Sequence, residues 1–247
     1  MISGSVLTSA AQLARERVLP VHPALGALFG SDVAGATSGL VRGQTVACVG
    51  TAAMSCALAL ATTATQTGSW AGVVGVPQVG VVAAQHLGVV LERTVFIALP
   101  TTTTSGERPD LVGALSALVD GVDLVIMARR TIAALSPSVM RRLQARVQSR
   151  GAVLVIIGDP GTTSIDLRVS ARAQYWQGIG TGHGHLRRRL VALELDGRRT
   201  VAVGGASPAG PCPVPGCGSR DLIGICIGIC IGLCIGGGTY YLPTHVP

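Results

Sequence analysis

The chain has 247 residues, of which 48% are hydrophobic and only 13% are charged. This length suits one domain, or one domain with a tail, and the apolar fraction can build a core without disulfides. All 19 positive side chains are arginines, so the composition excludes a P-loop lysine, a Schiff-base lysine and a lysine general base. The net charge of +7 permits an acidic partner such as nucleic acid, but charge alone defines no site.

Residues 1–38 are predicted to form an N-terminal helix and an extended arm. A short polar helix is expected near residues 9–19, and the two prolines of LPVHPALGALFG (19–30) favour an extended arm that packs on the rest of the protein. Arg15, Glu16 and Arg17 interrupt what would be the apolar core of a signal peptide. We therefore expect a cytoplasmic protein with no membrane anchor.

Residues 39–203 are predicted to form the core domain, because apolar runs alternate with helical stretches. The runs are TVACVG (45–50), WAGVVGV (70–76), TVFIAL (94–99), DLVIMA (123–128) and AVLVIIG (152–158). Continuous apolar strands that alternate with helices indicate an α/β fold, with a mostly parallel sheet and helices on both of its faces.

Two of the intervening helices have clear ends and faces. One begins at Asp110 and places Leu111, Leu115 and Leu118 on a single face. The other covers residues 137–150 and ends at Gly151, with its apolar residues spaced by four. Its arginines at 141, 142, 146 and 150 fall elsewhere, so a surface helix with a basic outer face is predicted.

After Asp159 the pattern changes to strands joined by turns. The segments DLRVSARAQYW (166–176), HLRRRLVALELDG (185–197) and RTVAV (199–203) are expected to add antiparallel strands at one edge of the sheet.

Residues 204–247 form a low-complexity tail with the repeat IGIC, IGIC, IGLC, IGGG. Glycine in a helix costs about 1 kcal/mol relative to alanine, so a strand is favoured over a helix for this repeat. Its fourteen residues, 222–235, are fewer than the roughly 20 that a spanning helix needs. The tail as a whole is expected to be disordered or aberrant.

The turn after the first core strand is where a P-loop would read G-x-x-x-x-G-K-[ST]. Gly50 matches the first glycine, but Ser55, Cys56 and Ala57 replace the second glycine, the lysine and the magnesium-binding hydroxyl. Without the lysine and the metal ligand, nothing offsets the charge of a triphosphate. An ordinary strand, turn and helix is the alternative interpretation of the same residues.

Several longer segments resemble the ImuA family, whose members are RecA-like proteins that assist bacterial DNA-damage mutagenesis. They include LPVHPALGALF, GLVRGQTVACVG, DGVDLVIMARR, MRRLQARVQSRGAVLVIIG and DLRVSARAQYWQGIGTGHGHLRRRLVALELDGRR, and together span about residues 19–199. The resemblance implies a RecA-like core with a degenerate P-loop. In RecA-like ATPases an aspartate and a glutamate follow two of the strands, where this chain has Ala128 and Pro77.

No catalytic residue, nucleotide, metal or other cofactor is therefore expected. His183 and His185 make only part of a metal site and are interpreted as loop residues. Arg168, Arg172 and the run Arg187, Arg188, Arg189 are the candidates for contact with DNA or with a protein partner. A solvated sheet edge is the alternative interpretation of these arginines.

The resemblance implies a non-enzymatic accessory or scaffold protein in error-prone translesion synthesis during the SOS response. Its partners would be an ImuB-type Y-family polymerase homologue and a DnaE-type error-prone polymerase, with recruitment to the nucleoid and direct DNA contact left open. Two other hypotheses are a SulA-like inhibitor of the division protein FtsZ and a RecA-like ATPase with unorthodox nucleotide contacts.

Overall fold

The structure is a computed structural model that describes residues 18–22, 25, 28–29, 39–99, 110–180, 183–197, 223–228 and 233–235. For residues 173–190 and for the two C-terminal segments it describes the backbone alone.

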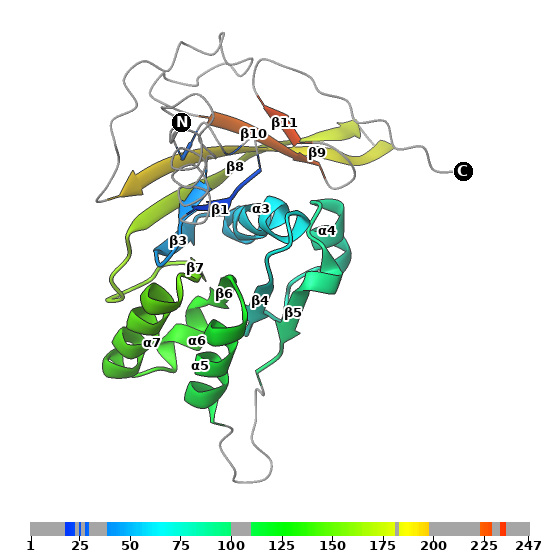
Figure 1. Ribbon diagram of the computed structural model, residues 1–247. Coiled ribbons are helices and arrows are strands. Elements are labelled where there is room, and N and C mark those ends of the chain that lie inside the picture. The colour runs from blue at the N-terminus through cyan, green and yellow to red at the C-terminus, as the bar shows by residue number, and fades with distance from the viewer. Residues whose placement is uncertain are drawn as a thin grey trace, which may run out of the picture.

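One mixed sheet organises the molecule, with the strand order β11-β10-β9-β8-β3-β7-β6-β4-β5 (Figure 1). Its parallel strands are β3 (Thr45–Val49), β4 (Ala71–Val74), β5 (Thr94–Ile97), β6 (Leu124–Ala128), β7 (Val153–Ile157) and β8 (Leu167–Gly180). The central strands consist almost wholly of buried apolar residues, as expected for a sheet covered on both faces. The predicted α/β class and mostly parallel sheet are confirmed.

The strands beyond β8 run antiparallel to their neighbours. They are β9 (His183–Gly197), β10 (Ile223–Gly228) and β11 (Leu233–Ile235). The antiparallel pairing expected for residues 166–176 and 185–197 is confirmed between β8 and β9, but β8 joins the sheet by running parallel to β3. The connection at 158–166 carries the chain from β7 across to the far side of β3, and this crossover fixes the direction of β8.

Helices cover both faces of the parallel strands. The longer helices are α3 (Ala53–Gln66), α5 (Leu111–Gly121) and α7 (Pro137–Arg150), and the short ones are α4 (Val81–His86), α6 (Arg129–Ala133) and the 3-10 turn η1 (Leu91–Arg93). Buried residues of α3 and α4 form one core with alternate residues of β3, β6 and β7. Those of α5 and α7 form a second core with the residues that point the other way from β6 and β7.

The ends of α5 and α7 are set by local sequence, as predicted. The Asp110 side chain accepts a hydrogen bond from the N–H of Gly113 at 2.8 Å and so caps α5. Ser136 caps α7 in the same way, and Pro137 supplies its first turn. Gly151 ends α7 with a φ of 67°, a left-handed conformation that glycine adopts without strain.

The N-terminal arm forms a small ribbon in place of the end of the predicted helix. β1 (Val18–Pro20) pairs antiparallel with β2 (Gly39–Val41), so the helix prediction is wrong at residues 18–19, while residues 9–17 lie outside the described part. Leu19 and Leu40 are fully buried against α3 and the sheet. The described part of the arm therefore packs on the core, as expected.

The predicted strand in the tail agrees with β10 and β11. β10 pairs with β9 over six residues, from Ile223 opposite Leu193 to Gly228 opposite Arg188. The other residues of 204–247 lie outside the described part of the chain.

Candidate functional site

The positions that correspond to nucleotide-binding residues of RecA-like ATPases all lie at one edge of the sheet. Gly50 follows β3, Pro77 lies shortly after β4, and Ala128 is the last residue of β6. Because these strands are parallel, their carboxyl ends meet at the same edge, where open α/β proteins bind their ligands. A binding site is therefore expected at this carboxyl edge.

The turn between β3 and α3 is occupied by contacts within the protein. Gly50 has a φ of 96°, and a Cβ at this position would overlap the carbonyl oxygen of Ala171 on β8. The same oxygen accepts a hydrogen bond from the N–H of Ala52 at 3.0 Å, and the N–H of Ala53 donates to Gly50 at 3.2 Å. Two backbone N–H groups of the kind that a P-loop presents to phosphate, those of Ala52 and Ala53, are thus bonded within the chain itself.

Ser55, Cys56 and Ala57 lie within the first turns of α3, and the turn ends before them. Cys56 is 1% exposed, and its sulfur lies 3.9 Å from the sulfur of Cys48 on β3. The hydrogen bond with Cys56, together with burial and the charge of the neighbouring thiol, raises the pKa of Cys48 well above its ordinary value. The position of the P-loop lysine is thus occupied by a buried cysteine side chain that faces the core.

An arginine links the chain segments that follow β4 and β6 at the carboxyl edge of the sheet. The chain leaves β4 toward β5 and leaves β6 toward β7, so the two connections diverge and create a topological switch point. Arg130 donates from Nε and Nη2 to the Gly75 carbonyl oxygen, at 2.9 Å each. Gly75 itself has a φ of 65°, and its N–H donates to Ile97 of β5.

Sequence reasoning missed Arg130. The only hint was the pair Arg129 and Arg130 directly after a buried strand that ends in alanine. Its partner is a backbone oxygen 55 residues away, and no local pattern identifies such a contact.

A hollow of about 350 Å³, lined by the neighbouring Arg129, lies between α6, the start of α7 and the loop after β7. Its polar lining includes Arg129, Asp159, Thr162 and Thr163. One arginine and one aspartate give the described lining no net charge for a triphosphate. The hydroxyl of Thr131 is buried close by, behind Gly75, with no hydrogen-bond partner among the described residues.

The two candidate arginines on β8 lie on one face of the strand. Leu167, Val169 and Ala171 are buried on the α3 side, so Arg168 and Arg172 point to the other side. Arg168 stands opposite Asp196 and approaches Asp159 at 4.0 Å, while Glu194 is diagonal to Arg172. Acidic residues therefore balance this pair, which weakens its suitability for a nucleic-acid backbone.

The remaining candidates lie in β9. Arg187, Arg188 and Arg189 have their backbone in this strand, and their side chains are outside the described part. His183 and His185 also belong to β9, so the expectation that they are loop residues is wrong. Among the described residues there is no group of three His, Cys, Asp or Glu that could hold a metal ion.

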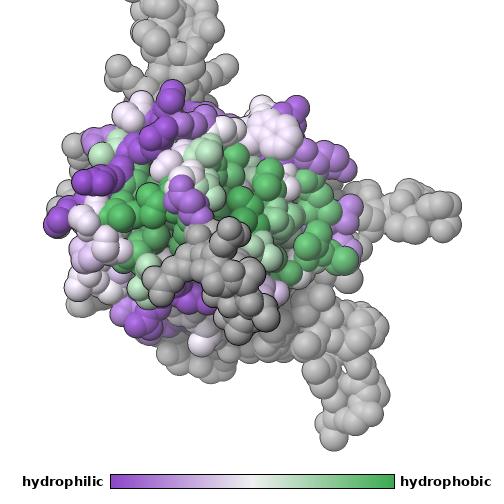
Figure 2. Space-filling model, turned by 90° about the horizontal axis from the view of Figure 1, so that it is seen from below, coloured by the Kyte–Doolittle hydropathy of each residue, from purple (hydrophilic) through white to green (hydrophobic). Residues whose placement is uncertain are grey.

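Apolar side chains gather in the middle of the face seen from below, with polar ones around them (Figure 2). The parallel strands of Figure 1 point toward this face. Val82 is 64% exposed and Val112 is 43% exposed, each in the first turn of a helix that follows a parallel strand. Exposed apolar groups at such a place suit contact with another protein better than contact with a phosphate.

The family described as the MT3502 N-terminal domain matches residues 34–162. The chain belongs to this family. The matched region holds β2 to β7 with helices α3 to α7, so both the turn after β3 and the Arg130 contact lie within the MT3502 N-terminal domain. β8, whose Ala171 closes the turn, lies beyond it.

A mycobacterial protein is similar to this chain over a longer stretch. The chain is 29% identical over 170 residues to "Uncharacterized protein Rv3395c" of Mycobacterium tuberculosis (strain ATCC 25618 / H37Rv). The match covers 67% of this chain and 64% of that protein. In the described part of the chain no helix has the length and apolar character needed to cross a membrane.

Proposed function

We propose that this protein is a non-catalytic, RecA-like accessory protein in SOS-induced error-prone translesion synthesis. In this role it binds an ImuB-type Y-family polymerase homologue and works beside a DnaE-type polymerase. The proposal joins the ImuA-like sequence segments to an α/β core whose first turn contacts β8 of the same chain.

The observation that carries the proposal is the filled turn after β3. The Ala171 carbonyl oxygen accepts a hydrogen bond from the N–H of Ala52, and Cys56 is buried at the position of the P-loop lysine. A triphosphate at this turn would meet no positive side chain among the matched residues 50–57 and fewer free backbone donors. The fold would then serve as a rigid support for a partner-binding surface.

The mutagenesis role is tested by deleting the gene. Damage-induced mutation frequency should fall, while homologous recombination stays at the wild-type level. Complementation with the wild-type gene and with Ser55→Ala should restore induced mutation equally, because no hydroxyl of this turn has a catalytic task. Unchanged induced mutation in the deletion strain would refute the proposal.

The partner is tested by co-purification from cells treated with a DNA-damaging agent. A tagged chain should retain the ImuB-type protein of the same organism. If the tagged chain instead retains FtsZ, and its overproduction blocks division, the SulA-like hypothesis replaces this one.

A further inference from the structure

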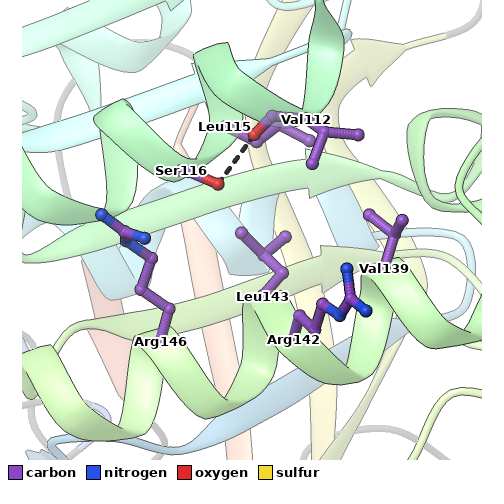
Figure 3. A pocket seen from close by; sticks show the side chains of 7 residues that line it. All are labelled: Val112, Leu115, Ser116, Val139, Arg142, Leu143 and Arg146. Carbon is purple, nitrogen blue, oxygen red and sulfur yellow. Dashed lines mark hydrogen bonds between the residues drawn. The ribbon is translucent and has the colours of Figure 1, made fainter.

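The outer surfaces of α5 and α7 enclose a groove that the proposed function leaves unused (Figure 3). Its cavity of about 190 Å³ is lined by Val112, Leu115, Ser116, Val139, Arg142, Leu143 and Arg146. Ligand pockets for small molecules usually hold about 300–1,000 Å³, so the volume suits one or two side chains of a protein better.

The two helices that form the groove run parallel to each other. Both lead from one parallel strand to the next on the same face of the sheet, so they run in the same direction. Val112 and Val139 line its first end, each in the first turn of its helix. At the other end Asp120 of α5 meets Arg146 and Arg150 of α7. The groove therefore has an apolar end and a basic end.

The apolar end offers a wall without unsatisfied polar groups. The Ser116 hydroxyl donates to the Val112 carbonyl oxygen at 2.8 Å and so does not need a partner in the groove (Figure 3). Leu115 and Leu143 form the floor, buried to 2% and 5% exposure. Val112 stays 43% exposed, so part of the wall is uncovered.

The rim of the groove carries excess positive charge. Arg146 and Arg150 share a single carboxylate, that of Asp120, which leaves one positive charge over. Arg142 makes no ion pair within the described part of the chain, and its guanidinium extends along the groove toward Val139 (Figure 3). A partner that fits must bring apolar side chains together with negative charge.

We propose that this groove binds an amphipathic helix of a partner protein, with an apolar stripe for Val112 and Val139 and a carboxylate for Arg142. Helix-in-groove binding uses apolar anchors at i, i+3 or i+4 and i+7, which matches the two-turn length of the groove. For the partner's identity the proposal rests on the proposed accessory function, in which the ImuB-type protein supplies the helix.

Two segments of the chain itself lack this chemistry. Residues 101–109, TTTTSGERP, contain no apolar stripe, and the repeat at 222–235 contains no acidic residue. Nucleic acid is also a poor match, because the groove floor is apolar and two of the three nearby arginines already face Asp120.

The probe for the test is a fluorescein-labelled helical peptide with leucines at i, i+4 and i+7 and flanking glutamates. Its binding to the full chain is measured by anisotropy, beside a peptide with lysines in place of the glutamates. We expect the acidic peptide to bind and the basic peptide to bind at least tenfold more weakly.

Two variants locate the binding, and a third is the matched control. Arg142→Glu and Val112→Asp should each weaken the acidic peptide about fivefold or more, whereas Arg141→Glu makes the same charge change outside the groove lining and should have less than a twofold effect. Thermal melts check that all three fold. Equal loss in Arg141→Glu and Arg142→Glu, no binding of the acidic peptide, or its displacement by duplex DNA with the same variant pattern would overturn the assignment.

The same variants separate this assignment from the proposed function. Purified ImuB-type protein should bind the wild type and lose affinity for Arg142→Glu and Val112→Asp. If it binds all variants equally, the groove assignment fails and the accessory function stands. If it never binds while the acidic peptide still depends on Arg142, the groove stands and the ImuB-type partner is wrong.

Discussion

The two helical layers of the sheet differ in how much of each helix they bury. Ten of the fourteen residues of α3 are buried, against three of the fourteen in α7 and two of the eleven in α5. α3 starts at the turn where related folds hold a ligand, yet here its first turn packs into the core. The layer of α5 and α7 instead keeps an open groove and a basic rim. This difference in burial is the reason why we propose a binding groove on the layer of α5 and α7 and not on that of α3.

The largest effect is expected in the layer of α3, when a lysine is introduced at the position that a P-loop lysine would occupy. Cys56→Lys puts an ammonium group at a 1% exposed site beside Cys48. Full burial shifts a lysine pKa by 3–5 units at about 1.4 kcal/mol per unit, so we expect a loss of roughly 4 kcal/mol or more, measured by denaturant unfolding. Ser55→Lys, at a half-buried position on the same helix, is the control and should lose far less. A stable Cys56→Lys variant that binds ATP would show that the turn is a dormant nucleotide site.

The contact between Gly50 and β8 gives the second test. Gly50→Ala should destabilise the protein both through its φ of 96° and through overlap with Ala171. Gly68 has a similar φ of 106° with nothing within 4 Å of its Cβ position, so Gly68→Ala should lose only about 1–2 kcal/mol for the conformation. Chemical denaturation compares the two. Equal losses would mean that Ala171 does not close the turn.

A buried hydroxyl on α3 gives a smaller effect. Thr65 accepts a hydrogen bond from the N–H of Val90 at 3.1 Å and so holds the segment before η1 against the helix. Thr65→Val leaves that N–H without its acceptor and should lower the free energy of unfolding by about 1–3 kcal/mol. Thr63→Val is the matched control on the more exposed side of the same turn. The interpretation fails if the two variants unfold alike.

The smallest effect is expected in the layer of α5 and α7, at Asp120. Hydrogen bonds and charge from Arg146, and then from Arg150, lower its pKa to about 2. Since the folded pKa lies below the ordinary value, this carboxylate stabilises the fold above that ordinary value and ceases to do so as the pH falls through about 2. Asp120→Asn should flatten the acid limb of the melting temperature against pH and lower that temperature only slightly at neutral pH.

Salt provides the control for Asp120. At about 1 M salt, where the screening length is near 3 Å, wild type and Asp120→Asn should melt together. A large difference that survives high salt would mean that Asp120 has a packing role between α5 and α7, and the groove would then be part of the core.

Local sequence predicted those parts of the fold that depend on local physics. The bounds of α7 were predicted at Pro137 and Gly151, because a proline suits a first helical turn and a left-handed stop favours glycine. The parallel strands are recognisable because strands buried on both faces contain unbroken apolar runs. The direction of β8 is not recognisable, since its alternating pattern is the same for either neighbour and the crossover decides it.

The sequence locates the turn after β3, but it does not reveal the contacts that this turn makes. A helical stretch after residue 50 was predicted, and α3 starts at Ala53, so Ser55, Cys56 and Ala57 lie in this helix. The residues that fill the edge, Ala171 and Arg130, act on backbone atoms far away in sequence. The apolar neighbours of Cys56 in the sequence are typical of a buried residue, but its contact with Cys48 is visible only in the fold.

Calorimetric titration of the full chain with MgATP tests the central claim most directly, because the claim is that the turn after β3 is filled by the protein itself. The account predicts only heats of dilution up to millimolar nucleotide, for the wild type and for Ser55→Ala alike. Saturable binding that Ser55→Ala or Gly50→Ala abolishes would contradict it, and the protein would then be a nucleotide-binding RecA-like protein with unorthodox contacts.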